Sequence, residues 1–98
     1  MQPIKRIEIV MDSSGAGELE SALAAARVTG WSKIPDVEGS GHRGRRTANL
    51  PMDVGSNVLF LIAAEPAVAD KVVAATRPIL ETWGGMCLVS DAAWVTHD

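Results

Sequence analysis

The sequence has one cysteine, no tyrosine and no long apolar run. Cys87 cannot form an internal disulfide bond, and a single cysteine cannot build a metal knuckle alone. The longest apolar run, Val58 to Ala64, is far shorter than the ~18 residues of a membrane span. Glu8 and Asp12 interrupt the N-terminal segment, so it predicts neither a signal peptide nor an anchor, and we expect a cytoplasmic protein.

Positive charge is also scarce: the sequence has nine Lys and Arg and twelve Asp and Glu, which gives a net charge of −3. A general nucleic-acid binder usually needs a basic domain that neutralises phosphates, so we expect no nucleic-acid partner. The 98 residues, 47% of them hydrophobic, are typical of one globular domain spanning 1–98. A chain this short buries only ~60–65% of its unfolded surface, so association with further copies would help.

The first half of the chain predicts a strand, a helix and a second strand. Apolar residues alternate over Ile4–Met11, which is typical of a half-buried strand. Asp12 offers an N-cap oxygen, and the Ala-rich stretch that follows predicts a helix ending at Gly30. Trp31–Val37 predicts a second strand. Because Pro35 lacks a backbone N–H, it suits an edge strand or the end of a strand.

The second half predicts a loop followed by a strand, a helix and a strand. Residues 39–57 have the composition of a loop, and Val58–Ala64 is typical of a central strand. Pro66 suits the first turn of a helix, which Pro78 should kink or end and which Gly84-Gly85 should close. The remaining expected elements are a strand over Met86–Val89, a turn over Asp91–Ala93 and, as an optional addition, a short strand at Trp94-Val95.

This order of elements predicts an α+β fold of the ferredoxin-like βαββαβ type, with both helices on one face of a single sheet. The first and third expected strands carry many aliphatic side chains. We therefore expect other subunits to bury the face of the sheet that the helices leave open.

The segment Gly39-Ser40-Gly41-His42-Arg43-Gly44 matches the pattern GxGxxG after an expected strand. A dinucleotide-binding site also needs a helix to start there, which Pro51 and the polar loop disfavour. The glycines still allow backbone N–H groups to form an anion site, and Arg43, Arg45 and Arg46 suit phosphates or carboxylates. The alternative is a solvated loop whose charges only maintain solubility.

Other candidate residues carry weaker signals. Gly84-Gly85 is explained by a helix C-cap and a turn. Cys87 lies in an apolar expected strand, which indicates a buried, inert thiol. His42 and His97 are the only histidines and form no metal-ligand pattern, so we expect no metal site. Because no catalytic triad or carboxylate pair is evident, we expect neither an enzyme nor a resident cofactor.

The run from Thr29 to Gly44 resembles the segment that enters the T-loop in the PII signal-transduction superfamily. The order of strands, helices and the Gly-Gly turn is also similar over nearly the whole chain, with 39–57 in the T-loop region. This resemblance implies a homotrimer that binds adenine nucleotides in clefts between subunits, holding phosphates with the T-loop base and a glycine-rich B-loop.

The resemblance also implies particular site residues. Those near the adenine would be Thr29, Gly30, Trp31 and Ser32. The T-loop base would consist of Gly39, Gly41, His42, Arg43 and Gly44, and the B-loop of Gly84 and Gly85. Arg43, Arg45 and Arg46 would form the site of a small anion.

This chain departs from the nitrogen-regulatory members in ways that change the expected ligands. It has no tyrosine to uridylylate, Met86 replaces a lysine after the B-loop glycines, and residues 87–98 contain no Lys or Arg. The short loop is more similar to PII-like proteins linked to carboxysomes and bicarbonate transport. We therefore expect ADP or AMP with ATP as a further candidate, bicarbonate as the anion, and a transporter or carboxysome component as partner. The alternative is a PII-like metal-binding or metal-responsive protein that uses His42 and His97.

Overall fold

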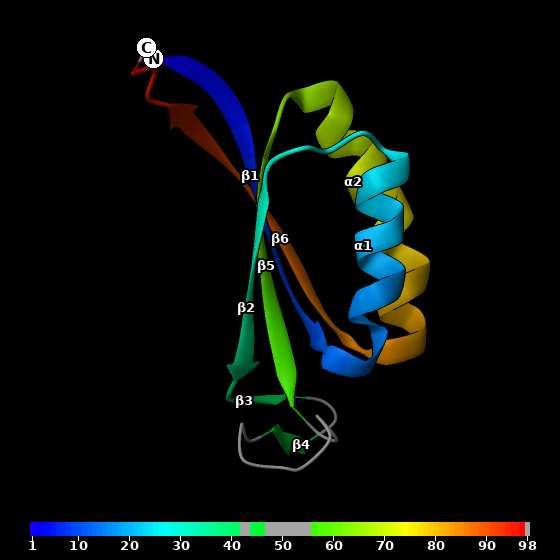
Figure 1. The fold of residues 1–98 in the computed structure, drawn as a ribbon. Helices are drawn as coiled ribbons and strands as arrows, with labels where there is room; N and C mark the ends of the chain where they lie inside the picture. Colours follow the sequence, from blue (N-terminus) through cyan, green and yellow to red (C-terminus); the bar gives the residue numbers. More distant parts are fainter. Residues whose placement is uncertain (42–43, 47–55, 98) are drawn as a thin grey trace.

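The computed structural model describes residues 1–41, 44–46 and 56–97 of the chain. Figure 1 shows the long strands in one sheet, with both helices packed on one of its faces. The elements are, in chain order, β1 (Gln2–Asp12), the 3-10 turn η1 (Ser13–Gly15), α1 (Ala16–Ala25), β2 (Trp31–Val37), β3 (Gly39–Gly41), β4 (Gly44–Arg46), β5 (Asn57–Ala64), α2 (Pro66–Trp83) and β6 (Gly85–Trp94).

The four long strands lie in the order β2-β5-β1-β6, and every neighbouring pair is antiparallel. The short strands β3 and β4 pair with each other in a separate two-stranded sheet. The expected α+β, ferredoxin-like βαββαβ arrangement is therefore confirmed.

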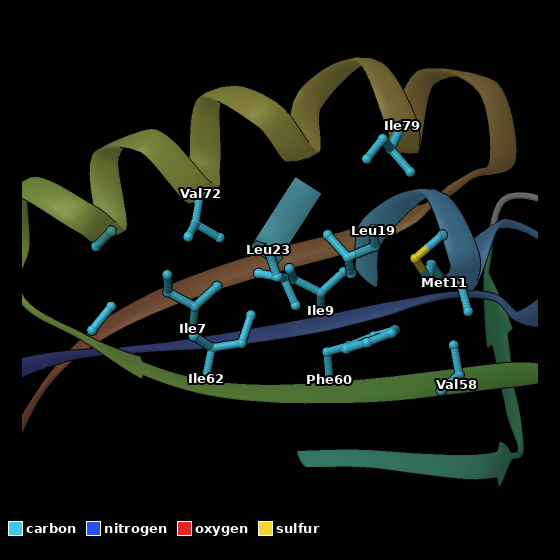
Figure 2. Close-up of a cluster of buried hydrophobic side chains, with 13 residues drawn as sticks. Ile7, Ile9, Met11, Leu19, Leu23, Val58, Phe60, Ile62, Val72 and Ile79 are labelled. Carbon is cyan, nitrogen blue, oxygen red and sulfur yellow. The ribbon is translucent and has the colours of Figure 1, made fainter. Parts of the chain in front are cut away.

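The core fills the space between the sheet and the two helices. Alternate residues of the two central strands point toward the helices, as expected for a period of two. Figure 2 shows these buried side chains: Ile7, Ile9 and Met11 from β1, Val58, Phe60 and Ile62 from β5, Leu19 and Leu23 from α1, and Val72 and Ile79 from α2. The hydroxyl of Thr76, also buried, donates to the Val72 carbonyl at 2.7 Å. The core therefore depends on apolar packing, with the hydroxyl of the buried Thr76 satisfied.

The first helix ends at Ala25, five residues before Gly30, where we expected its end. Arg27 takes the left-handed conformation with φ of 62°. The Val28 N–H donates to the Leu23 carbonyl and the Arg27 N–H to the Ala24 carbonyl, each at 3.0 Å. These two bonds form a Schellman C-cap, in which arginine occupies the position that usually favours glycine.

The second helix continues through Pro78, so the expectation that it could end there is wrong. Proline removes one intrahelical bond, which would otherwise join its nitrogen to the carbonyl of Ala74. Both Pro78 and Ala74 are exposed, so water can satisfy that carbonyl. Thr76 and Ile79 hold the other side of the helix against the core.

The last strand is longer than expected, because Asp91–Ala93 belongs to β6 and does not form a turn. These residues pair with the beginning of β1, where Lys5 faces Asp91 and Gln2 faces Trp94. Lys5 and Asp91 also form an ion pair. Pairing with residues almost ninety positions away therefore keeps this polar stretch extended.

Candidate functional site

The glycine-rich segment after β2 forms a β-hairpin. Gly39 pairs with Arg46, and Gly41 pairs with Gly44. The chain enters it through an irregularity at the end of β2, between Ile34 and Val37, where Asp36 has φ of 61°. An extended hairpin cannot supply the helix N-terminus that a dinucleotide fingerprint requires, so the GxGxxG pattern is not such a fingerprint here.

Only some of the cations predicted for this segment lie among the described residues. Arg45 and Arg46 belong to β4. His42 and Arg43 lie outside the described residues, as do residues 47–55 of the expected T-loop region. The structure therefore places the backbone of Arg45 and Arg46 in the hairpin, while contacts of the predicted cations with a ligand stay a prediction.

The Gly84-Gly85 turn has a clear structural reason. Gly84 caps α2 by donating its N–H to the Leu80 carbonyl at 2.7 Å, and its φ is 78°. Gly85 has φ of 133°, and a Cβ there would lie 2.1 Å from the Val10 carbonyl oxygen. Both positions favour glycine for backbone reasons, as the interpretation of a C-cap and turn predicted.

A contact beneath this turn was not predicted from the sequence. The Trp83 indole donates from Nε1 to Glu18 Oε1 at 3.1 Å. Its ring lies against Gly15, where a Cβ would be 2.5 Å from the ring atoms. The end of α2 is thereby held against η1 and the start of α1. No sequence signal joins Gly15 to Trp83, because the two residues are far apart along the chain.

The two glycine clusters lie at the same end of the sheet (Figure 1). Val37, at the end of β2, pairs with Asn57, which in turn pairs with Asp12 at the end of β1. Gly85 pairs with Met11. However, β2 and β6 are opposite edges of the sheet. Three strand spacings separate them, which is roughly 14 Å.

The residues predicted to surround an adenine lie elsewhere. Trp31 pairs with Ile62 at the opposite end of β2 from Val37, about 20 Å away along the strand. Trp31 is half-buried, and its ring lies 5.6 Å from the Phe60 ring, centroid to centroid. Thr29, Gly30 and Ser32 are exposed. One chain therefore brings the hairpin glycines and Gly84-Gly85 to one end of the sheet, but not residues 29–32.

Cys87 lies in a groove of about 390 Å³ between α2 and β6, together with Arg77 and Glu81. The thiol is half-buried, less enclosed than the sequence predicted. Burial raises its pKa above the ordinary 9.0, an effect that the positive charge of Arg77 partly opposes. The thiol is therefore protonated near neutral pH and weakly nucleophilic.

We predict that Cys87 reacts several-fold more slowly with N-ethylmaleimide at pH 8 in the folded protein than in urea. The reason is the smaller thiolate fraction of the folded state. Because the folded chain holds this proton more tightly, stability should also fall as pH rises above about 9. Equal alkylation rates in the folded and unfolded protein would contradict this prediction.

The described residues give no support to the metal-binding alternative. Among residues 1–41, 44–46 and 56–97, no group of three or more His, Cys, Asp and Glu side chains could hold a metal ion. Of the two histidines, His97 is described and His42 is not. Within the same part of the chain, no helix is long and apolar enough to cross a membrane.

Comparison with known proteins identifies the family. The family model for nitrogen regulatory protein P-II matches residues 4–98, so the chain belongs to this family of signalling regulators. No sequence match was found among curated proteins.

Solved structures share the fold at low sequence identity. CPII from Thiomonas intermedia K12, a PII-like protein bound to ADP, AMP and bicarbonate, is similar with a TM-score of 0.84 and 19% identity, over 92% of this chain and 86% of that one. A protein from Thermus thermophilus, assigned to the PII-like signalling proteins, gives 0.78 and 19%, over 96% and 91%. The GlnK–ATP complex of B. subtilis gives 0.71 and 18%, over 94% and 84%.

Proposed function

We propose that this protein is a PII-like regulator that binds an adenine nucleotide, ADP or AMP in preference to ATP, and a small anion such as bicarbonate. The observation that supports this most is the position of the two glycine-rich turns at one end of the sheet. Glycine-rich backbone can present N–H groups to phosphates. The similar CPII structure, bound to ADP, AMP and bicarbonate, adds support by analogy.

We place the nucleotide between subunits of a homotrimer. In one chain the two turns lie at opposite edges of the sheet, and Trp31 lies at the other end of β2. A ligand in contact with all three groups therefore needs the edge of a second chain beside the first. The site residues would then be Thr29–Ser32, Gly39, Gly41–Gly44 and Gly84-Gly85, contributed by two neighbouring chains.

The face of the sheet opposite the helices, which we call the open face, supports the trimer. Its exposed apolar side chains come from all three of the strands β2, β5 and β6: Ile34, Leu61, Met86, Leu88 and Trp94. A monomer would leave this apolar surface in water. Three copies could bury these faces against one another.

The charge distribution supports ADP or AMP over ATP. Met86 follows the Gly84-Gly85 turn, and no Lys or Arg follows Arg77 along the chain. The clustered cations of the hairpin segment, Arg43, Arg45 and Arg46, are also assigned to the small anion. The further phosphate of ATP would then be buried with little compensating charge.

Isothermal titration calorimetry with AMP, ADP and ATP, each with and without bicarbonate, tests this function. We expect ADP or AMP to bind at least as tightly as ATP. Arg43→Ala should weaken binding more than tenfold, because a charge-assisted hydrogen bond contributes ~1.5–3 kcal/mol. Lys71→Ala, which removes an exposed cation from α2, is the matched control and should bind like the wild type.

Three results would contradict parts of this assignment. If no adenine nucleotide bound, the proposed function would be wrong. ATP binding more than tenfold tighter than ADP and AMP would overturn the nucleotide preference. Unchanged binding by Arg43→Ala would remove Arg43 from the site.

The proposal extends to the setting in which the protein acts. We propose that it is cytoplasmic and signals through the T-loop region, 39–57, to a protein partner. A transporter or a carboxysome component would suit a sensor of bicarbonate and adenine nucleotides.

A further inference from the structure

A charged pair lies in the middle of the apolar open face. Glu8 of β1 has exposed leucines on both sides, because its Cα partners are Leu61 on β5 and Leu88 on β6. The next residue of β1 on this face, Arg6, lies between Ala63 and Ser90. The other positions of this face on Ile4–Val10, Leu59–Ala63 and Met86–Trp94 are uncharged.

Arg6 and Glu8 form an ion pair within one chain, with Arg6 Nε 3.2 Å from Glu8 Oε1. An exposed pair of this kind contributes little to the stability of a monomer. A carboxylate between two leucines also reduces the apolar area that this face can bury. The pair therefore has no clear benefit for a single chain.

We propose that the Arg6–Glu8 pair fixes the register in which the open faces of copies of this chain associate. The proposal rests on the homotrimer of the proposed function and names what specifies its geometry. Over Ile4–Val10, Leu59–Ala63 and Met86–Trp94 the face has one cation and one anion in adjacent rows, so this part of it is complementary in charge to another copy of itself. An acidic or a basic partner would leave one of the two charges unmatched.

The surroundings of Arg6 suit a contact between chains. The pair engages Nε, and a guanidinium has further N–H donors that can reach a second carboxylate. Ala63 and Ser90 are small, so they leave space beside the guanidinium for the Glu8 of a neighbouring chain. Any shifted arrangement would place these charges against the leucines of the neighbour.

We expect the pair to affect the geometry and stoichiometry of association between chains more than its strength. When both members of a buried ion pair are replaced by apolar residues, stability often changes little or rises. Loss of one member alone leaves an uncompensated buried charge, which is destabilising. Single polar residues at apolar interfaces are known to fix register and oligomeric state. We therefore expect single and double variants to behave in opposite ways.

Native mass spectrometry and sedimentation velocity over a concentration series test this inference. Arg6→Glu and Glu8→Arg should each raise the midpoint concentration of assembly at least tenfold, and the exchanged pair R6E/E8R should restore it to within about threefold. R6L/E8L should assemble as readily as the wild type but in more than one stoichiometry. Lys5→Gln is the matched control, because Lys5 pairs with Asp91 on the helix side of the same strands.

Different results would overturn the role of the Arg6–Glu8 pair and the proposed trimer. A wild-type trimer that none of the Arg6 and Glu8 variants disturbs would overturn the role of the pair and leave the trimer intact. Failure of R6E/E8R to recover would also overturn it, provided that circular dichroism shows a folded chain. A wild type that stays monomeric at all concentrations would overturn the trimer itself, and calorimetry with ADP would then show whether nucleotide binding survives.

Discussion

Gly85→Ala is expected to lower the free energy of unfolding by about 3 kcal/mol or more. The new Cβ would lie 2.1 Å from the Val10 carbonyl oxygen and 2.9 Å from the Met11 Cα, and the residue has φ of 133°. Such a conformation alone costs ~1–3 kcal/mol for a residue other than glycine. Relief of the clash must move backbone at the point where β6 pairs with β1. Urea unfolding followed by tryptophan fluorescence measures the loss.

Gly17→Ala is the matched control for this substitution. Gly17 lies in α1, and nothing lies within 4 Å of the position of its Cβ. Alanine is favoured over glycine inside a helix by roughly 0.5–1 kcal/mol, so this variant should be slightly more stable than the wild type. Both variants must be compared at one protein concentration, because the proposed assembly would stabilise the folded chain. If Gly85→Ala unfolded at the midpoint of the wild type, the close approach to Val10 would be wrong.

Leu88→Asp is expected to convert the proposed trimer into monomers at micromolar concentration. Leu88 is 55% exposed, lies on the open face and has Glu8 as its Cα partner. Two neighbouring carboxylates would then have to be buried at the interface between chains. An uncompensated buried charge costs ~3–5 kcal/mol, which corresponds to a more than hundredfold weaker association. Light scattering coupled to size-exclusion chromatography measures the change.

Val89→Asp serves as the control for Leu88→Asp. Val89 is the next residue of β6 and is 47% exposed, but it faces the groove beside α2 on the opposite side of the sheet. This variant should keep the oligomeric state of the wild type. Loss of the trimer in Val89→Asp alone would show that the helix side of β6 forms the interface.

The sequence predicted the parts of the fold that depend on local pattern. The expected bounds of the second strand, Trp31–Val37, are those of β2, because a glycine precedes it and the loop glycines follow it. The ends that depend on tertiary pairing were not predicted. The Arg27 cap of α1 has no glycine signal, and Ser90-Asp91 interrupts the apolar pattern of β6 although β1 pairs with both residues.

In the candidate site, too, the sequence predicted local features but not those that depend on strand pairing. The glycine pattern predicted the Gly84-Gly85 turn, which depends on backbone conformation. Residues 39–57 were expected to form a loop, so the β3–β4 hairpin at its start was not predicted. The separation of the hairpin and the turn across the sheet could not be predicted, because it depends on which strands occupy the two edges. The resemblance grouped residues 29–32 with these turns, whereas a single chain keeps Trp31 at the far end of β2.

The pairing of Gln2 with Trp94 brings the beginning and the end of the chain side by side (Figure 1). β1 spans 11 residues, so its start lies roughly 33 Å along the strand from the end of the sheet that carries the hairpin. An affinity tag or a surface linker attached at either terminus would therefore stay clear of that end. Immobilised through such a linker, the protein would keep its hairpin accessible to nucleotides and to candidate partner proteins in solution.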